Sequence, residues 1–183
     1  MLFISYSAMV IFITAGWCLA RGLLFLQRRS TTLKRELQLL LVYICIVVVA
    51  RFTFFPFSKV NGQIQPLVFD PSLALSFRVN WIPMVNLLDY PALRDILINV
   101  IGNTAMFIPL GIVWPCVYPQ LNTPVKTLGA GVGFSLLIEI LQLPFYDRVT
   151  DIDDLLLNSL GFLLGYLIYR LARLIKQKLT NAN

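Results

Sequence analysis

The sequence contains no histidine, only three cysteines and few charged residues. Without histidine, the chain cannot form His-based metal sites or the Ser-His and Cys-His pairs of many hydrolases. Cys18, Cys45 and Cys116 each lie inside an apolar run without paired spacing, which argues against a disulfide framework or a zinc site.

Charged residues make up 13% of the 183 residues, and hydrophobic residues make up 58%. An ordinary soluble domain is about 25% charged, and a soluble fold of this size could not bury so much apolar surface. The composition therefore indicates a membrane protein. Although the net charge of +6 could suggest nucleic acid, we expect the lipid bilayer, and no nucleic acid, as the first partner.

Five apolar stretches are long enough to cross a bilayer, which requires roughly 20 mainly apolar residues. They are residues 1–26, 37–57, 96–119, 127–146 and 154–175. We expect the first to be a retained anchor, because it lacks the basic segment and the small-residue cleavage site of a signal peptide. The sequence thus predicts an all-α integral membrane protein, a bundle of about five transmembrane helices.

The basic residues orient this bundle, because cytoplasmic loops carry an excess of Lys and Arg. One side holds ten of them: Arg21, Arg28, Arg29, Lys34, Arg35, Lys126, Arg170, Arg173, Lys176 and Lys178. The other side holds five: Arg51, Lys59, Arg78, Arg94 and Arg148. This asymmetry predicts an external amino terminus and a cytoplasmic carboxy terminus.

Three segments are predicted from this topology. Residues 1–57 form two transmembrane helices with a basic cytoplasmic loop, 58–175 form an external loop with three transmembrane helices, and 176–183 form a basic cytoplasmic tail. Within the external loop, residues 79–88 are apolar enough to lie in, or dip into, the outer leaflet.

Polar residues recur at helical spacing on each of the last three spans, so each span carries one polar face. The three sets are Asp95, Asn99 and Asn103; Ser135, Glu139 and Gln142; and Asp151, Asp154 and Asn158. Polar groups are costly in hydrocarbon unless they face protein, water or a partner. We therefore expect the three faces to line a polar cleft open to the outside, with Arg51, Arg94 and Arg148 as counter-charges at its rim.

Several of these residues also have purely structural interpretations. Amides in membrane helices often only hydrogen-bond between helices, which accounts for Asn99, Asn103, Gln142 and Asn158 about as well as a ligand site does. The stretch from Thr150 to Asp153 fits a capping box, with Thr150 as the cap, and Asp151 could also serve the helix end.

Glu139 and Asp154 are harder to explain structurally, since an intramembrane carboxylate is a functional-site hypothesis by default. An ion pair with an arginine is the structural alternative for Glu139. The pairs Gly129/Gly133 and Gly161/Gly165 are spaced for close helix approach.

These residues together resemble the VanZ-like family of bacterial membrane proteins. The matching blocks are Asn80-Trp81-Ile82-Pro83, Asn99-x-x-x-Asn103-x-x-x-Phe107-x-Pro109-x-Gly111, Ser135-x-x-x-Glu139-x-x-Gln142 and Arg148-x-x-Asp151-x-x-Asp154-x-x-x-Asn158-x-x-Gly161-x-x-x-Gly165. Met84 departs from the aromatic residue or leucine expected there, and the first two spans match only in character. The resemblance implies a multi-pass protein of the bacterial cytoplasmic membrane. The best-known member of the family lowers susceptibility to the glycopeptide teicoplanin.

Three functions are compatible with this sequence. The first is a non-catalytic envelope protein that binds a lipid-linked cell-wall precursor or a lipoglycopeptide, with these ligand-binding candidates: Asn80, Asn99, Asn103, Glu139, Gln142, Arg148, Asp151, Asp154 and Asn158. The second is a membrane enzyme acting on a lipid-linked precursor, with Glu139 and Asp154 as acid, base or ligands of a divalent cation. The third, a small transporter, is disfavoured because the polar faces stop halfway across the membrane. We expect no cofactor other than such a cation.

Overall fold

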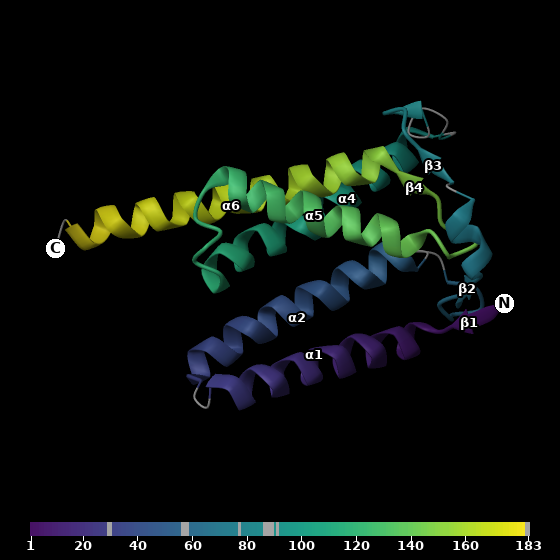
Figure 1. Cartoon of the computed structure of the whole chain (residues 1–183). Coiled ribbons are helices and arrows are strands. Elements are labelled where there is room, and N and C mark those ends of the chain that lie inside the picture. Colours follow the sequence, from purple (N-terminus) through teal and green to yellow (C-terminus); the bar gives the residue numbers. More distant parts are fainter. Residues whose placement is uncertain (29–30, 56–58, 77, 86–89, 91, 182–183) are drawn as a thin grey trace. The chain divides into compact units, whose positions relative to one another are not determined.

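The protein is mostly helical (Figure 1). The computed structural model describes residues 1–28, 31–55, 59–76, 78–85, 90 and 92–181. Within these residues, five helices are long and apolar enough to cross a membrane: α1 (Tyr6–Arg28), α2 (Leu33–Phe54), α4 (Leu93–Val117), α5 (Pro124–Gln142) and α6 (Ile152–Asn181). The remaining elements are β1 (Leu2–Ile4), β2 (Leu67–Phe69), the 3-10 helix η1 (Pro71–Leu75), β3 (Val79–Asn80) and β4 (Thr150–Asp151). The prediction of an all-α, multi-pass membrane protein is confirmed.

The carboxyl end of α5 differs from the predicted fourth span. The helix ends at Gln142 and not at Tyr146. Pro144 has no N–H to continue the helical pattern, and the Phe145 N–H instead donates to the Gln142 carbonyl in a turn. Proline chemistry therefore overrides the apolar composition of this stretch.

α2 begins earlier than its predicted span, and α6 ends later than its predicted span. α2 begins at Leu33, because the Thr32 side chain caps it by accepting a hydrogen bond from the Arg35 N–H. α6 continues through Asn181, so residues 176–181 of the predicted tail are helical. Hydropathy locates the apolar part of such helices but not their polar, capped ends.

The chain folds as two compact units, which are described separately. Unit one comprises Met1–Arg78 and Leu141–Thr150, and unit two comprises Val79–Ile140 and Asp151–Asn183. This division differs from the predicted segments 1–57, 58–175 and 176–183, which stay a prediction about domains.

In unit one, α1 and α2 lie side by side as a helical hairpin (Figure 1). The Thr14 and Tyr43 hydroxyls are 2.7 Å apart, and the ring centroids of Trp17 and Tyr43 are 5.7 Å apart. Near the connection between the helices, the Arg21 guanidinium donates to the Glu36 carboxylate at 2.5 Å. No residue of the apolar stretch of α1 is buried within the described structure. The polar and aromatic interactions above therefore make up much of the described packing between α1 and α2.

The segment after α5 packs on the connection that follows α2 in unit one. β1 pairs antiparallel with β2, and the Tyr146 N–H donates to the Val68 carbonyl of β2 at 2.9 Å. The Arg78 guanidinium donates to the carbonyls of Phe145 and Tyr146 at 2.8 and 3.0 Å. The carbonyls of Phe145 and Tyr146 therefore satisfy N–H donors of Arg78. The sequence predicted Arg78 only as an external basic residue.

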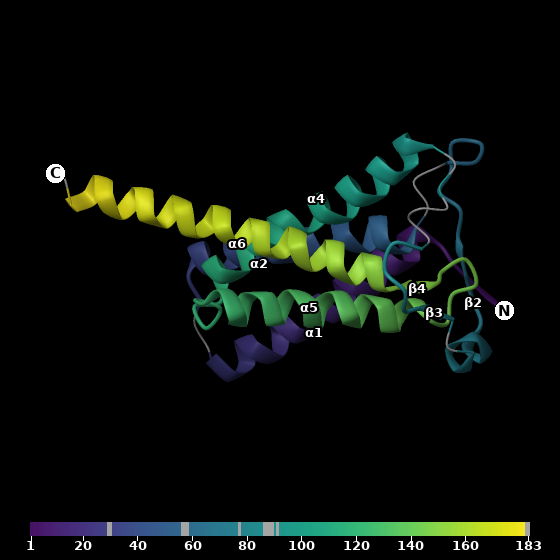
Figure 2. The same cartoon turned by 90° about the horizontal axis from the view of Figure 1, so that it is seen from above.

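In unit two, α4 and α6 pack against each other through their backbones (Figure 2). A Cβ atom on Gly161 would overlap the Thr104 carbonyl of α4, and one on Gly165 would overlap the Ile108 carbonyl. The step from Thr104 to Ile108 runs in the same direction as the step from Gly161 to Gly165. α4 and α6 are therefore parallel, as the third and fifth spans of an alternating bundle must be.

The glycine pattern was only partly predicted. The close approach expected at Gly161 and Gly165 is confirmed, whereas the one expected at Gly129 and Gly133 is wrong, because no described atom lies within 4 Å of a Cβ built at either position. On α5 it is Gly131 that accommodates a neighbour, the Phe162 side chain of α6. Spacing alone therefore does not identify the glycine that meets a neighbouring helix.

Alanine at Gly161 or Gly165 is expected to destabilise the protein by about 1–3 kcal/mol, the usual cost of inserting a methyl group where the structure has no room. Alanine at Gly129 is the matched control and should be neutral or slightly stabilising, because alanine favours helix more than glycine does. Thermal unfolding of the detergent-purified variants measures the difference. Equal losses for all three variants would contradict the backbone contact between α4 and α6.

Candidate functional site

The nine ligand-binding candidates divide between the two units. Unit two holds seven of them, grouped around the amino-terminal end of α6: Asn80, Asn99, Asn103, Glu139, Asp151, Asp154 and Asn158. Unit one holds the other two, Gln142 and Arg148. Each group is built from different contacts.

The start of α6 is capped by an aspartate. Asp151 immediately precedes the helix, and its Oδ1 accepts a hydrogen bond from the Asp153 N–H at 2.9 Å. The capping box predicted with Thr150 as the cap is therefore wrong, since the Thr150 N–H donates to the Arg78 carbonyl where β4 lies beside β3. Aspartates in the first turn also interact favourably with the helix dipole.

Glu139 of α5 is directed at the same helix start. Its side chain is buried, and its Oε2 accepts a hydrogen bond from the Asp151 N–H at 3.1 Å. A carboxylate that accepts from a backbone N–H forms a charge-assisted hydrogen bond, which is stronger than a neutral one. Glu139 thus joins α5 to the backbone where α6 begins.

A chain of amides connects α4 to Asp154 of α6. The Asn103 Nδ2 donates to the Asp154 Oδ1 at 2.5 Å and to the Asn99 Oδ1 at 3.3 Å. The Asn99 Nδ2 in turn donates to the Tyr90 hydroxyl at 3.3 Å. The structure therefore brings together the polar faces of the third and fifth spans, and it adds Tyr90, which no sequence spacing indicated.

Deeper in unit two, α5 and α6 share a fully buried polar pair. The Asn158 Nδ2 donates to the Ser135 Oγ at 3.0 Å, and both residues are buried. The Asn158 Oδ1 has no hydrogen-bond partner among the described residues. The pair corresponds to the structural interpretation of these residues, an interhelical hydrogen bond.

The connection that precedes α4 is anchored to the acids of α6. The Asn80 Nδ2 lies 3.4 Å from both carboxylate oxygens of Asp151, and the Asn80 Oδ1 accepts from the Ile82 N–H. The Met84 N–H lies 2.9 Å from both oxygens of Asp153. Asp153, predicted as a capping residue, instead anchors this connection.

The anchored connection presents apolar side chains outward. Trp81 is 74% exposed, Ile82 is 64% exposed and Met84 is 57% exposed. Met84 has a φ of 68°, which is uncommon for a residue other than glycine. Residues 86–88 of the predicted segment 79–88 lie outside the described residues. The described part exposes apolar side chains, and its position in the outer leaflet stays a prediction.

Gln142 and Arg148 bind the carboxyl end of α2. The Gln142 Nε2 donates to the Thr53 carbonyl at 2.6 Å, and the Arg148 Nε and Nη2 donate to the Phe54 carbonyl at 3.0 and 2.8 Å. The last carbonyls of a helix lack partners within it, and a cation there interacts favourably with the dipole. These two ligand-binding candidates therefore have a helix-capping role, and sequence spacing could not indicate it because the capped helix lies about 90 positions away.

The described residues contain no group of three or more His, Cys, Asp or Glu side chains placed to hold a metal ion. Acids in unit two accept hydrogen bonds from main-chain N–H groups and from side-chain amides. The arrangement can hold hydrogen-bond donors, because carboxylate oxygens have several lone pairs each.

Asp153→Ala should release the connection that carries Trp81 and Met84. A hydrogen bond to a charged acceptor contributes about 1.5–3 kcal/mol, so protection of the Met84 amide from hydrogen exchange should fall about tenfold or more. Exchange measured in detergent on the full chain tests this, with Asp147→Ala as the control because Asp147 is an exposed acid in unit one. Unchanged protection in Asp153→Ala would show that other contacts hold the connection.

Comparison with known proteins identifies the family. The family described as VanZ/LLP1 matches residues 40–173, well over half of the chain, in agreement with the resemblance carried by the blocks between Asn80 and Gly165. No curated protein and no solved structure matches the chain. The matched region runs from α2 into α6 and contains every residue of the polar group described above. The chain belongs to the VanZ/LLP1 family.

Proposed function

We propose that this protein is an envelope protein of the bacterial cytoplasmic membrane that binds an amphipathic ligand at the outer leaflet. The ligand is a lipoglycopeptide such as teicoplanin, or a lipid-linked cell-wall precursor, and binding contributes to teicoplanin resistance. Its polar part lies at the start of α6, and its apolar tail lies on the exposed connection around Trp81.

One observation carries this proposal. The same acids that start α6 hold the backbone of a connection whose apolar side chains are exposed, through the contacts of Asp151 with Asn80 and of Asp153 with Met84. The acids and the exposed apolar side chains are therefore held next to each other. Such an arrangement fits a ligand with a polar head and an apolar tail, because ligand sites combine apolar lining with a few placed polar groups.

The chemistry of the polar group favours one class of head. Glu139, Asp151, Asp153 and Asp154 are all acids, and the amides of Asn99 and Asn103 add further acceptors. Carboxylates attract ammonium, amide and hydroxyl donors and repel phosphate. A lipoglycopeptide, with sugar hydroxyls and peptide N–H groups, fits such a group better than a pyrophosphate-linked precursor does.

The orientation predicted from the basic residues puts this group at the external face. The start of α6 then lies at the outer leaflet, where a tail on Trp81 and Ile82 would enter the lipid. Ligands reach such a position from outside or by diffusion within the leaflet, without crossing the membrane.

Asp154→Asn and Trp81→Ala test the proposal separately at the head and the tail. Wild-type chain expressed in a teicoplanin-sensitive bacterium should raise the inhibitory concentration, and both variants should lose most of this gain at equal membrane abundance. Binding of labelled teicoplanin to the purified protein should weaken about tenfold in each, the effect of losing a contact that contributes about 1.4 kcal/mol. Asp147→Asn, an exposed acid in unit one, is the control and should behave as wild type.

Protection against a glycopeptide without an acyl tail distinguishes binding of the tail from a general effect on the envelope. The proposal requires that the protein give little protection against it, because the tail contact is missing. If Glu139→Gln binds teicoplanin normally while resistance disappears, the acid–base alternative, in which Glu139 and Asp154 act on a lipid-linked precursor, is favoured over binding alone. Equal protection against both glycopeptides would contradict the proposal.

A further inference from the structure

A groove in unit one lies between the two helices of the α1–α2 hairpin, far in sequence from the polar group of unit two. Its volume is about 620 Å³, within the range of roughly 300–1,000 Å³ typical of small-molecule sites. It is lined by apolar side chains and a few polar ones, among them Trp17, Arg21, Phe25, Glu36, Leu37 and Leu40.

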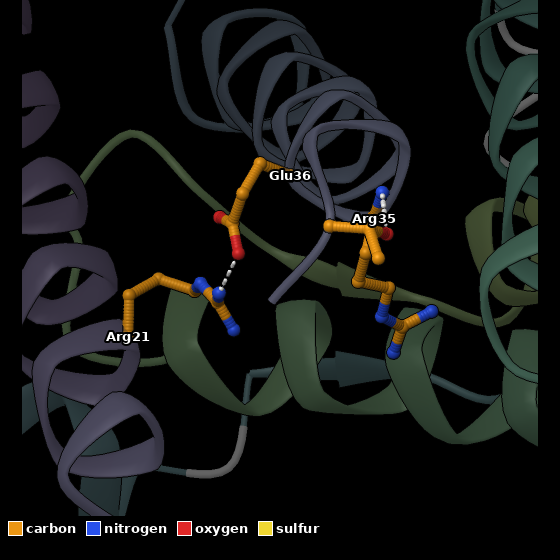
Figure 3. Close-up of polar contacts among 4 residues, drawn as sticks. Arg21, Arg35 and Glu36 are labelled. Atoms are coloured by element: carbon orange, nitrogen blue, oxygen red, sulfur yellow. Dashed lines mark hydrogen bonds and ion pairs between the residues drawn. The ribbon is translucent and has the colours of Figure 1, made fainter. Parts of the chain in front are cut away.

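Among the described residues, the ion pair between Arg21 and Glu36 supplies charged groups to the lining of this groove. Figure 3 shows the Arg21 side chain extending from α1 toward Glu36 of α2, with the two joined at 2.5 Å. Arg35, the neighbour of Glu36, extends to another side of α2 in the same view and does not line the groove. Among the described residues that line the groove, Arg21 is the basic one.

Arg21 lies deep along α1. It follows Tyr6, the first residue of the helix, by 15 positions, which corresponds to about 22 Å at 1.5 Å per residue. The hydrocarbon core of a bilayer is about 30 Å thick, and exposed apolar residues continue beyond Arg21 as far as Leu26. The guanidinium thus starts from the level of acyl chains and has to reach a polar partner, because an unpaired charge there is costly.

Glu36 is one such partner, but it leaves some N–H donors of the guanidinium available. The guanidinium has five N–H donors, and one of its terminal nitrogens donates to Glu36. The Arg21 side chain is 22% exposed, so the groove has access to it. Lys34 and Arg35 add positive charge to the same helix start, where Glu36 is the one acid of the first turn.

We propose that this groove binds an anionic phospholipid of the inner leaflet, with the lipid phosphate on Arg21 and an acyl chain along the apolar wall. Charge complementarity selects the anionic head, since basic pockets between helices on the cytoplasmic side are suited to anionic lipid head groups. The apolar lining selects a lipid over a soluble anion. Glu36 holds Arg21 in position, because its carboxylate accepts a hydrogen bond from the guanidinium within the groove.

Lipid binding to the full-length protein, measured by native mass spectrometry with phosphatidylglycerol and with phosphatidylcholine of the same acyl chains, tests the head-group contact. Phosphatidylglycerol should bind about tenfold more tightly than phosphatidylcholine, and Arg21→Gln should remove most of that preference. Arg35→Gln is the matched control with the same loss of charge and should retain it. Equal losses in both variants, or no preference in the wild type, would overturn the proposal.

Filling the groove tests the acyl-chain contact without touching the ion pair. Gly22 lines the groove, and a Cβ built there meets nothing within 4 Å among the described residues. Gly22→Phe should therefore fold and exclude the lipid, whereas Gly16→Phe, an equally open position of α1 that does not line the groove, should bind lipid as wild type does. Equal binding by both variants, or displacement of the lipid by inorganic phosphate, would overturn the proposal.

Discussion

The arrangement of unit two depends on the direct backbone contact between α4 and α6. Gly161 and Gly165 have no space for a Cβ atom, because the Thr104 and Ile108 carbonyls occupy it. In hydrocarbon, helices gain little from burying apolar surface, so close packing of this kind has to hold them together. Once the two backbones touch, side chains nearer the start of α6 are near enough to bond, and Asn103 meets Asp154 at 2.5 Å.

Polar groups within the bilayer impose the second constraint, and the chain satisfies it largely through its own backbone. Glu139 accepts from the Asp151 N–H, Asp153 accepts from the Met84 N–H, and Arg148 donates to the Phe54 carbonyl. Each contact joins the end of an element to a side chain from another element. Charged residues in this protein therefore fix the ends of helices and the connections between them, and the apolar side chains of those connections remain exposed.

The sequence predicted the membrane spans well, and it predicted the helix ends and the side-chain partners poorly. The five spans followed from hydropathy, because that signal depends on residues within one helix. Glycine spacing correctly predicted the contact at Gly161 and Gly165 and wrongly predicted one at Gly129 and Gly133. Hydropathy did not predict the helix ends. Thr32 caps α2 through one hydrogen bond, and Pro144 lacks the N–H that would continue α5. Spacing within one helix also gives no information on partners far along the chain.

Arg148 illustrates this limit for the candidate site. Its position near the polar faces predicted a counter-charge in a cleft, and the fold directs it to the end of α2 in unit one. Asp153 shows the opposite case, because a residue interpreted as a cap holds the connection that presents Trp81. The contacts of Arg148 with the Phe54 carbonyl and of Asp153 with the Met84 N–H could not be predicted from spacing, since tertiary structure sets these partners.

The two charged sites are built on side chains of different chemistry, and the two proposals accordingly assign them different ligands. In unit one, Arg21 is paired with the Glu36 carboxylate, and Lys34 adds positive charge to the same helix start. In unit two, the Asp153 carboxylate accepts from the Met84 N–H, a neutral donor that satisfies hydrogen bonding without cancelling charge. A hydrogen bond from a neutral donor stabilises an anion but leaves its field in place, and that field is weakly screened next to hydrocarbon. Under the two proposals, the start of α6 binds its ligand through hydrogen-bond donors and the α1–α2 groove binds its ligand through a phosphate, so one ligand head would not satisfy both sites.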